Sequence, residues 1–152
     1  MYEVKPFESL QVGDRVCVSK TITEADGALY IAATGDFGPV HVDDGYAAAS
    51  RFGRRLAPGL MVAGLCTSVL TSELVGILGV SIEDRFWFTG PVFYGDTITI
   101  DVWIAERLPE SRTLVWEASA RNEQGLEVLK ASATLKFPRP KDDSHARSPN
   151  AT

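Results

Sequence analysis

Apolar and polar residues alternate with a period of two through the second half of the chain. The alternation is longest where Ile98, Ile100, Val102 and Ile104 are separated by more polar residues. Strands that bury one face and expose the other have this pattern, so it predicts about four antiparallel strands. The alternating runs cover residues 85–88, 97–104, 113–119 and 129–137.

A strand and a first helix are predicted near the N-terminus. Residues 14–23 follow a Gly-Asp turn signal and place apolar residues on one face, which predicts a strand. Thr23 and Asp26 have the spacing of an N-terminal capping box, in which each side chain binds the other residue's backbone amide. We expect the helix to run through Ala33, because Gly35 suits the left-handed conformation that ends many helices.

A loop and a second short helix follow. Pro39 lacks an N–H and keeps the preceding residue out of the helical region, so we expect residues 36–44 to be extended or turning. Asp43 or Asp44 can cap a short helix that ends before Gly53.

The most apolar segment of the chain predicts one long helix. We expect it to begin at Pro58, since proline is favoured at the first helical position, and to reach Val75 or Gly76. Such a helix spans roughly 27 Å. Apolar residues cover most of its circumference, so we expect it to be buried on nearly all sides, with the sheet wrapped around it. Early helices, one buried helix and a run of strands together predict an α+β fold.

Length and composition favour a single domain. With 152 residues and 45% hydrophobic content, the chain is expected to form one globular domain over residues 1–137. The first ten residues have a mixed composition and predict an arm. From residue 138 on, the sequence is polar and rich in proline and charge, which predicts a disordered tail over residues 138–152.

The charge and the cysteines limit the function classes. The formal net charge is −5 and there is no large Lys/Arg cluster, so nucleic acid is not expected as a partner. We expect a cytoplasmic protein without a membrane segment, because neither a signal peptide nor a run of roughly 20 apolar residues is evident. Cys17 and Cys66 lie in apolar surroundings and fit no metal-ligand spacing, which predicts buried, reduced thiols and no metal site.

Three short motifs follow one another along the chain. Residues 36–41 hold an aspartate, four intervening residues including a proline, and a histidine. Residues 57–61 read Ala-Pro-Gly-Leu-Met, and residues 90–97 read Gly-Pro-Val-Phe-Tyr-Gly-Asp-Thr. In this order they resemble the hydratase motif, the opening of the central helix and the strand junction of the MaoC-like hydratase/dehydratase family, the R-specific enoyl-CoA hydratase type. The resemblance covers roughly residues 23–137 and implies the hotdog fold, a curved antiparallel sheet wrapped around a long central helix.

The resemblance implies hydration of a trans-2-enoyl-CoA thioester, or the reverse dehydration of a 3-hydroxyacyl-CoA, without a metal or redox cofactor. It implies that Asp36 is the base and that His41 holds and shuttles the proton. The amide of Gly59 would contact the thioester oxygen. Tyr30 and Phe37 either line the acyl pocket or pack in the core. The helix residues expected to contact the substrate are Pro58, Leu60, Met61 and Gly64.

The implied roles agree with the chemistry of the residue types. One carboxylate and one imidazole around a single water can deprotonate the water and protonate the α-carbon, and positioned proton transfer contributes about 10²–10⁴-fold. The reaction forms an enolate, which the free N–H groups and positive dipole end of a helix N-terminus stabilise. Pro58 has no N–H, so Gly59 carries the first free amide of the predicted helix.

The chain departs from the family pattern at the site. Many hydratases of this family have asparagine at the position of Gly38 and histidine at that of Pro58. Gly64 or a neighbour replaces a polar side chain that some members have in the helix, which would widen the acyl pocket. These departures leave Asp36 and His41 intact and leave the acyl group of the substrate open.

Structural roles for the same residues are alternatives. Asp36 follows a glycine at a helix end, where aspartate is frequently a turn residue. His41 can be a structural histidine, and Asp43 is expected to be a helix cap and not a catalyst. A small basic cluster is either a solvated surface or a contact for the phosphates of CoA: Arg51, Arg54 and Arg55.

Two further functions compete with hydration. A hotdog thioesterase would use a carboxylate to activate water at the carbonyl, without a paired histidine on one loop. A non-catalytic acyl-CoA-binding subunit of a hetero-oligomer would need neither residue. Because a lone hotdog leaves a sheet edge open, we expect a homodimer or a higher homo-oligomer with CoA near the interface.

Overall fold

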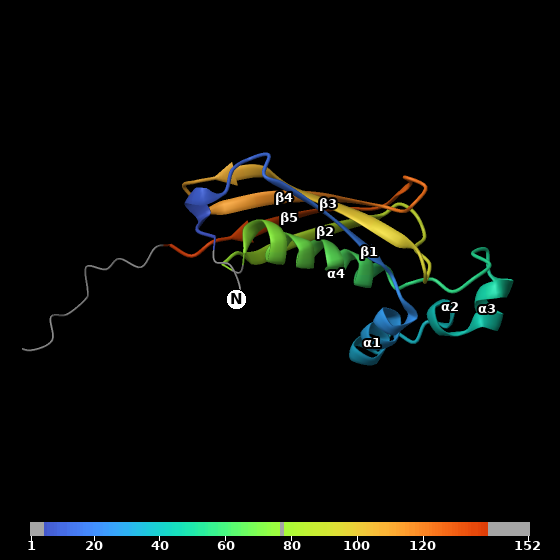
Figure 1. Cartoon of the computed structure of the whole chain (residues 1–152). Helices are drawn as coiled ribbons and strands as arrows, with labels where there is room; N and C mark the ends of the chain where they lie inside the picture. The colour runs from blue at the N-terminus through green and yellow to red at the C-terminus, as the bar shows by residue number, and fades with distance from the viewer. Residues whose placement is uncertain (1–4, 77, 140–152) are drawn as a thin grey trace, which may run out of the picture.

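Five antiparallel strands form one sheet in the computed structural model, which describes residues 5–76 and 78–139 (Figure 1). In space the strands follow the order β1-β3-β4-β5-β2, so β1 and β2 are the two edges. The strands have these bounds: β1 (Arg15–Thr21), β2 (Val80–Phe88), β3 (Thr97–Leu108), β4 (Thr113–Arg121) and β5 (Glu127–Lys136).

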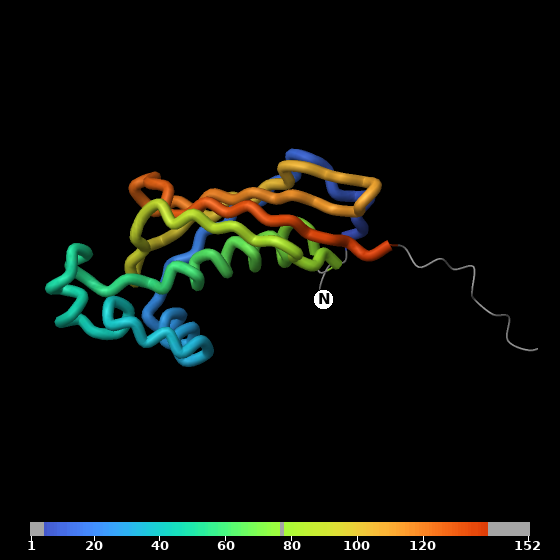
Figure 2. Tube along the Cα trace, turned by 180° about the vertical axis from the view of Figure 1, so that it is seen from behind, coloured from blue at the N-terminus to red at the C-terminus, as the bar shows by residue number. Residues whose placement is uncertain are grey.

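The central helix lies along one face of the sheet, and the other helices lie beyond one end of that sheet. α1, α2 and α3 lie together past the N-terminal end of α4 (Figure 1), and the view from behind shows the same separation (Figure 2). A 3₁₀ turn at Phe7–Ser9 precedes β1, and a π-helical segment at Leu70–Val75 continues α4. The helices have these bounds: α1 (Glu24–Thr34), α2 (Pro39–Val42), α3 (Asp44–Ala49) and α4 (Gly59–Val69).

The core forms between α4 and the inward face of the sheet. Buried residues alternate with half-buried ones along the first eight residues of β3, as the period of two requires. The buried residues of α4 are Val62, Ala63, Cys66 and Val69. Full burial of each large aliphatic side chain contributes about 1.5–3 kcal/mol, so the contact between helix and sheet is the main source of stability.

The predicted α+β architecture, an antiparallel sheet over one long helix, is confirmed. The alternating runs lie in β2, β3, β4 and β5, and the predicted first strand contains β1. The expected start of the long helix is wrong by one residue, because Pro58 is the N-cap with an extended ψ of 128° and Gly59 is the first helical residue.

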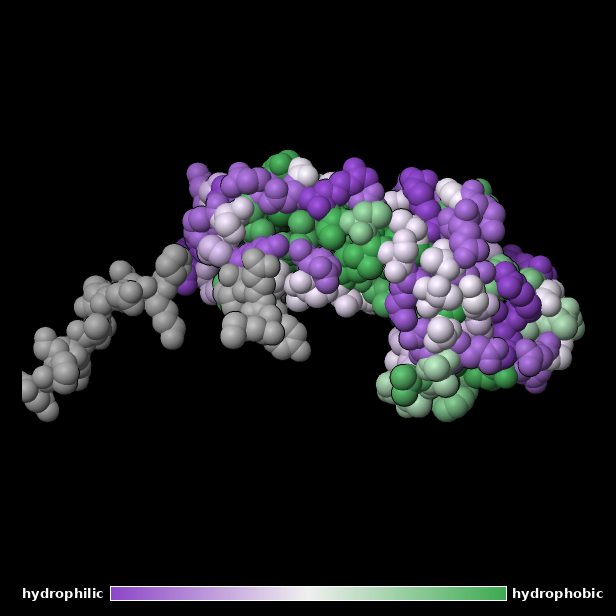
Figure 3. Space-filling view, viewed as in Figure 1, coloured by the Kyte–Doolittle hydropathy of each residue, from purple (hydrophilic) through white to green (hydrophobic). Residues whose placement is uncertain are grey.

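The prediction that the long helix is buried on nearly all sides is wrong for this chain by itself. Leu60 is 59% exposed. At Gly64 an added Cβ would meet no atom within 4 Å. The sheet covers one side of α4 and leaves this stripe open, and apolar surface is visible over the α4 side of the molecule (Figure 3). No helix in the described ranges has both the length and the hydropathy needed to cross a membrane.

The predicted N-terminal arm is wrong for the described residues 5–10. Phe7 and Leu10 are each 2% exposed and belong to the core. The rings of Phe7 and Phe137 lie with their centroids 5.5 Å apart. This packing ties the start of the chain to the end of the sheet. Of the predicted disordered tail, residues 140–152 lie outside the described residues.

The two cysteines have different environments. Cys66 is fully buried, and burial raises the pKa of its thiol to about 12, which keeps it neutral. Cys17 is exposed, so its predicted burial is wrong. The reason is that β1 is an edge strand in which Val16 and Val18 take the more buried positions and Cys17 points the other way.

A capping box starts α1, as the sequence predicts. Thr23 Oγ1 accepts from the Asp26 amide at 3.1 Å, and Asp26 Oδ2 accepts from the Thr23 amide at 2.9 Å. The Lys20 ammonium lies 3.1 Å from the same carboxylate oxygen. The Thr23 hydroxyl also donates to Asp26 Oδ2 at 2.7 Å, and this bond first, followed by those from the Thr23 amide and Lys20, lowers the pKa of Asp26 to about 2.

We expect Asp26→Asn to lower the free energy of unfolding at neutral pH, because the amide accepts hydrogen bonds more weakly and cannot pair with Lys20. The folded pKa of Asp26 lies below its ordinary value of 3.8, so the carboxylate stabilises the fold above pH 3.8 and loses this effect as the pH falls toward 2. Urea unfolding of both proteins at pH 7, 5 and 3 should show a difference that narrows at pH 3. An equal difference at all three pH values would contradict the role of the charge.

Candidate active site

The end of α1 positions Asp36. Gly35 is the C-cap in the left-handed region, with φ 74°, and its amide donates to the Ile31 carbonyl at 2.8 Å. Glycine adopts this conformation without a Cβ penalty, so the chain leaves the helix axis directly before Asp36. The carboxylate of Asp36 stays 46% exposed.

A four-residue helix, α2, carries His41. Gly38 has an extended ψ of 125° before Pro39, as the restriction on residues preceding proline requires, and Pro39 then takes the first helical position. The expectation of an extended or turning loop is therefore wrong for Pro39–Val42, where the proline starts a helix. The His41 side chain is 16% exposed.

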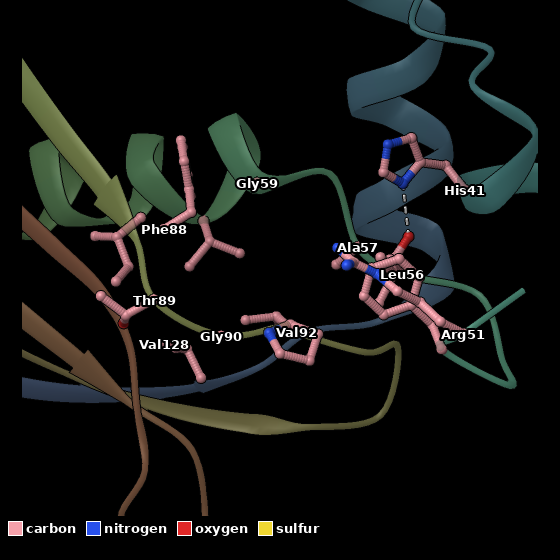
Figure 4. Close-up of a pocket in the computed structure, with 14 residues that line it drawn as sticks. His41, Arg51, Leu56, Ala57, Gly59, Phe88, Thr89, Gly90, Val92 and Val128 are labelled. Carbon is pink, nitrogen blue, oxygen red and sulfur yellow. Dashed lines mark hydrogen bonds between the residues drawn. The ribbon is translucent and has the colours of Figure 1, made fainter.

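The backbone of Leu56 fixes the imidazole of His41. Nδ1 of His41 donates to the Leu56 carbonyl at 2.9 Å (Figure 4). A carbonyl only accepts, so the neutral ring carries its hydrogen on Nδ1 and presents Nε2 as an acceptor. The Leu56 amide donates to the Val40 carbonyl at 3.0 Å, and the Ala57 amide donates to the Val92 carbonyl at 2.9 Å. These bonds hold α2 in place relative to the segment that leads into α4.

Asp36 and His41 face each other. His41 Nε2 lies 3.9 Å from Asp36 Oδ2. This separation exceeds the roughly 2.7–3.2 Å of a direct hydrogen bond, and in the neutral tautomer both atoms are acceptors. One water that donates a hydrogen to each atom fits this geometry. A Cβ at Gly38 would lie 3.1 Å from His41 Cδ2 and 3.4 Å from Asp36 Oδ1, so glycine keeps the approach to both groups open.

The start of α4 supplies amide donors. Pro58 has no N–H, and within the described part of the chain the amides of Gly59 and Leu60 have no hydrogen-bond acceptor. Such free amides and the helix dipole favour a negative charge at this end of α4. A Cβ at Gly59 would lie 3.0 Å from the Phe88 ring, so the glycine allows this ring to approach the start of the helix.

His41 and Gly59 line the same cavity, which has a volume of about 500 Å³. Phe88 and Val128 lie at one end of it and Arg51 lies at the other (Figure 4). Most of the lining is apolar. An apolar cavity with a few polar groups at one place is typical of a site for a small organic ligand.

His41 also lines a second cavity, of about 510 Å³, beside α1. Phe37 and Tyr94 contribute aromatic rings to its wall. Tyr94 packs so closely on Gly27 that a Cβ there would overlap the ring. Burial raises the pKa of Tyr94, so its hydroxyl is neutral and can act as a hydrogen-bond donor.

The other carboxylates near the pair are engaged elsewhere. Arg55 donates to Asp44 and to Glu24 at 2.6 Å each. Asp43 caps α3, as predicted, by accepting from the Tyr46 amide at 2.8 Å. Across residues 5–76 and 78–139, no three His, Cys, Asp or Glu side chains are grouped as a metal site requires.

The structure brings the three predicted catalytic residues into one region. Asp36 and His41 form the close pair. Gly59 and His41 both line the cavity of about 500 Å³ between α4 and Arg51, which is the main cavity of the site. Phe37 lies on the second cavity and is 67% exposed.

The other predicted contact residues line neither of these two cavities. Pro58 is buried, and Met61 is half-buried against the core. Tyr30 is half-buried on α1. Leu60 and Gly64 belong to the exposed stripe of α4, one turn apart.

Several lining residues were missed because they come from distant segments. Val92 and Val128 lie just before β3 and within β5, and only the folded sheet brings them to α4. The sequence signal for Val92 was present in the motif at residues 90–97. Leu56 acts through its backbone carbonyl, and no property of its side chain indicates that contact.

Comparison with known proteins gives consistent matches over most of the chain. The family model described as "MaoC like domain" matches residues 11–121. The chain is 36% identical to a 3-hydroxybutyryl-CoA dehydratase of Methylorubrum extorquens, over 88% of this chain and 84% of the relative. It is 30% identical to an (R)-specific enoyl-CoA hydratase of Rhodospirillum rubrum, over 87% of this chain and 91% of the relative.

A solved structure supports the same assignment. The R-hydratase PhaJ1 of Pseudomonas aeruginosa, in its unliganded form, superposes with a TM-score of 0.81 at 29% identity. The match covers 89% of this chain and 86% of that one.

Proposed function

The chain belongs to the MaoC-like domain family, and we propose that it adds water to a trans-2-enoyl-CoA thioester, or removes it from the 3-hydroxyacyl-CoA, with Asp36 and His41 acting through one water. The fold is the hotdog of the R-hydratases. Hydro-lyase chemistry is the activity by which the relatives are named, and they cover most of the chain.

One observation supports the assignment of residues above the others. It is the 3.9 Å separation of His41 Nε2 and Asp36 Oδ2, beside a cavity that His41 and Gly59 both line. Two acceptors at this distance suit a water that donates to both. The oxygen of that water is then free to attack the β-carbon of the enoyl group.

The steps balance with these groups alone. Asp36 accepts a proton from the water as its oxygen bonds to the β-carbon, and the double-bond electrons move to the thioester oxygen. His41, held by Leu56, shares and orients the proton, which then passes to the α-carbon as the enolate collapses. Positioned proton transfer of this kind contributes about 10²–10⁴-fold. The sequence of steps needs no metal or redox cofactor.

The N-terminus of α4 stabilises the enolate. Gly59 is the first residue of α4, and its amide has no acceptor among the described residues. A preorganised donor at a developing oxyanion contributes about 10²–10³-fold in kcat. The apolar cavity beyond it takes the acyl group, with Phe37 on the neighbouring cavity as a further acyl contact.

We propose a homodimer formed along β2. Val80, Ile82, Trp87 and Phe88 are all exposed on this edge strand, whereas the exposed residues of β1 at the other edge are mostly polar. An open apolar edge favours pairing with a second copy. The exposed stripe of α4 at Leu60 and Gly64 would then be covered, which would give these residues and Met61 a place near the substrate.

The assay for the proposed function uses crotonyl-CoA and follows loss of the conjugated enoyl absorbance against release of free thiol. We expect loss of absorbance without thiol release. Asp36→Asn should lower kcat by about 10²–10⁴-fold, because the amide cannot accept the water proton. Asp43→Asn is the matched control, since it removes a nearby charge while asparagine still caps α3, and should keep kcat within about twofold. Thiol release in place of hydration would identify a thioesterase instead.

Two variants at one position test the amide donor. Gly59→Pro removes the N–H, and the helix tolerates it because this position makes no intrahelical bond and Pro58 is already extended. Gly59→Ala keeps the N–H and brings the same Cβ against Phe88. We expect kcat of the proline variant to be lower than that of the alanine variant by a further 10²–10³-fold or so. Equal losses would show that the effect is steric and that the amide does not bind the oxyanion.

A charge on the β2 edge tests the dimer. We expect the wild type to show twice the chain mass in size-exclusion chromatography with light scattering, and Ile82→Lys to shift it toward the single chain, because lysine blocks edge pairing. Leu126→Lys is the control, as Leu126 is a similarly exposed apolar residue in the turn between β4 and β5. Dissociation by both variants, or by neither, would place the interface elsewhere.

A further inference from the structure

Arg51 places one permanent positive charge on the main cavity. Among the described residues that line this cavity, it is the single lysine or arginine, and no carboxylate is present. The only other titratable side chain of the lining is that of His41. An anionic group entering at this end would therefore meet a positive charge, and no carboxylate of the described lining would oppose it.

The two neighbouring arginines already have carboxylate partners. Arg54 lies 3.1 Å from Asp96, and Arg55 binds both Asp44 and Glu24. Arg51 makes neither an ion pair nor a hydrogen bond to any residue in the described ranges, and it is exposed. The basic cluster therefore contains two arginines with structural roles and one that is available to a ligand.

Stacking orients Arg51 and leaves its donors free. Its Cζ lies 4.6 Å from the centroid of the Phe52 ring, and Phe52 lines the same cavity. This contact with the ring uses no N–H donor in a hydrogen bond, so the N–H groups of Arg51 remain able to bind oxygen. Figure 4 shows Arg51 near Leu56 and Ala57, at the end of the cavity away from Phe88.

We propose that Arg51 binds an anionic oxygen group of the substrate, either a phosphate of CoA or a carboxylate at the far end of the acyl chain. The proposal rests on the proposed function, because it takes the cavity to hold an acyl-CoA thioester. The fork of N–H donors matches both oxygen groups. The chain carries a net charge of −5, so a local cation is needed to offset its general repulsion of an anionic substrate.

Three substrates separate the two sources: crotonyl-CoA, crotonyl-pantetheine, which has no phosphate, and glutaconyl-CoA, which adds a terminal carboxylate. If the group is a phosphate, Arg51→Gln should raise KM for both CoA thioesters about tenfold, with kcat nearly unchanged and no added loss on the pantetheine thioester. If it is the carboxylate, only glutaconyl-CoA should show this rise. Arg51→Lys keeps the charge but loses the fork of N–H donors, so its KM should lie between those of the wild type and Arg51→Gln.

Arg54→Gln is the matched control, because it removes the same charge from the same cluster but from an arginine paired with Asp96, and it should leave every KM unchanged. Equal changes on all three substrates, or no change on any, would overturn the proposal. Calorimetric titration with CoA, pantetheine and glutaconyl-CoA measures Kd for the wild type and the variants, and so makes the same comparison without turnover. A wild type that binds CoA but hydrates nothing would refute the proposed function, while these titrations would still decide the role of Arg51.

Discussion

The candidate site depends on the hydrogen bond from His41 to the Leu56 carbonyl, because this bond decides which ring nitrogen can face Asp36 as an acceptor. Leu56 lies three residues before α4, and its own amide binds the Val40 carbonyl. The same short segment therefore orients the imidazole and sets the direction in which the first amides of α4 point. Backbone hydrogen bonds of Leu56 thus connect α2, which carries His41, to the N-terminus of α4.

The main core and the pair of Asp36 and His41 lie in different parts of the chain. The large buried side chains lie between α4 and the sheet, whereas α1, α2 and α3 lie beyond the end of that sheet. Local signals hold the second region: the capping box at Thr23, the left-handed Gly35 and the extended Gly38 before Pro39. Short-range sequence features therefore position Asp36 and begin α2, and the backbone of Leu56 and Ala57 joins this region to α4 and the sheet.

The features that follow from short-range rules could be predicted from sequence. Alternation gave the strands, and the Thr23 and Gly35 signals gave the bounds of α1. α2 was missed because four residues are too few to show a helical period. The burial of Phe7 and the exposure of the stripe on α4 depend on which residues far apart in the sequence pack against them, and a local sequence pattern does not indicate this. The sequence motif brought Asp36, His41 and Gly59 to one region, while their catalytic roles stay predictions.

The acid and the imidazole lie within six consecutive residues, which follow Gly35 and run into α2. An insertion or deletion inside this stretch would separate the two groups and leave every strand register unaltered. A duplicated gene for such a chain can thus lose the pair in one mutational event and keep a folded product. Inactive sister subunits are the expected evolutionary by-product of an architecture whose proposed acid and imidazole occupy so short a stretch of sequence.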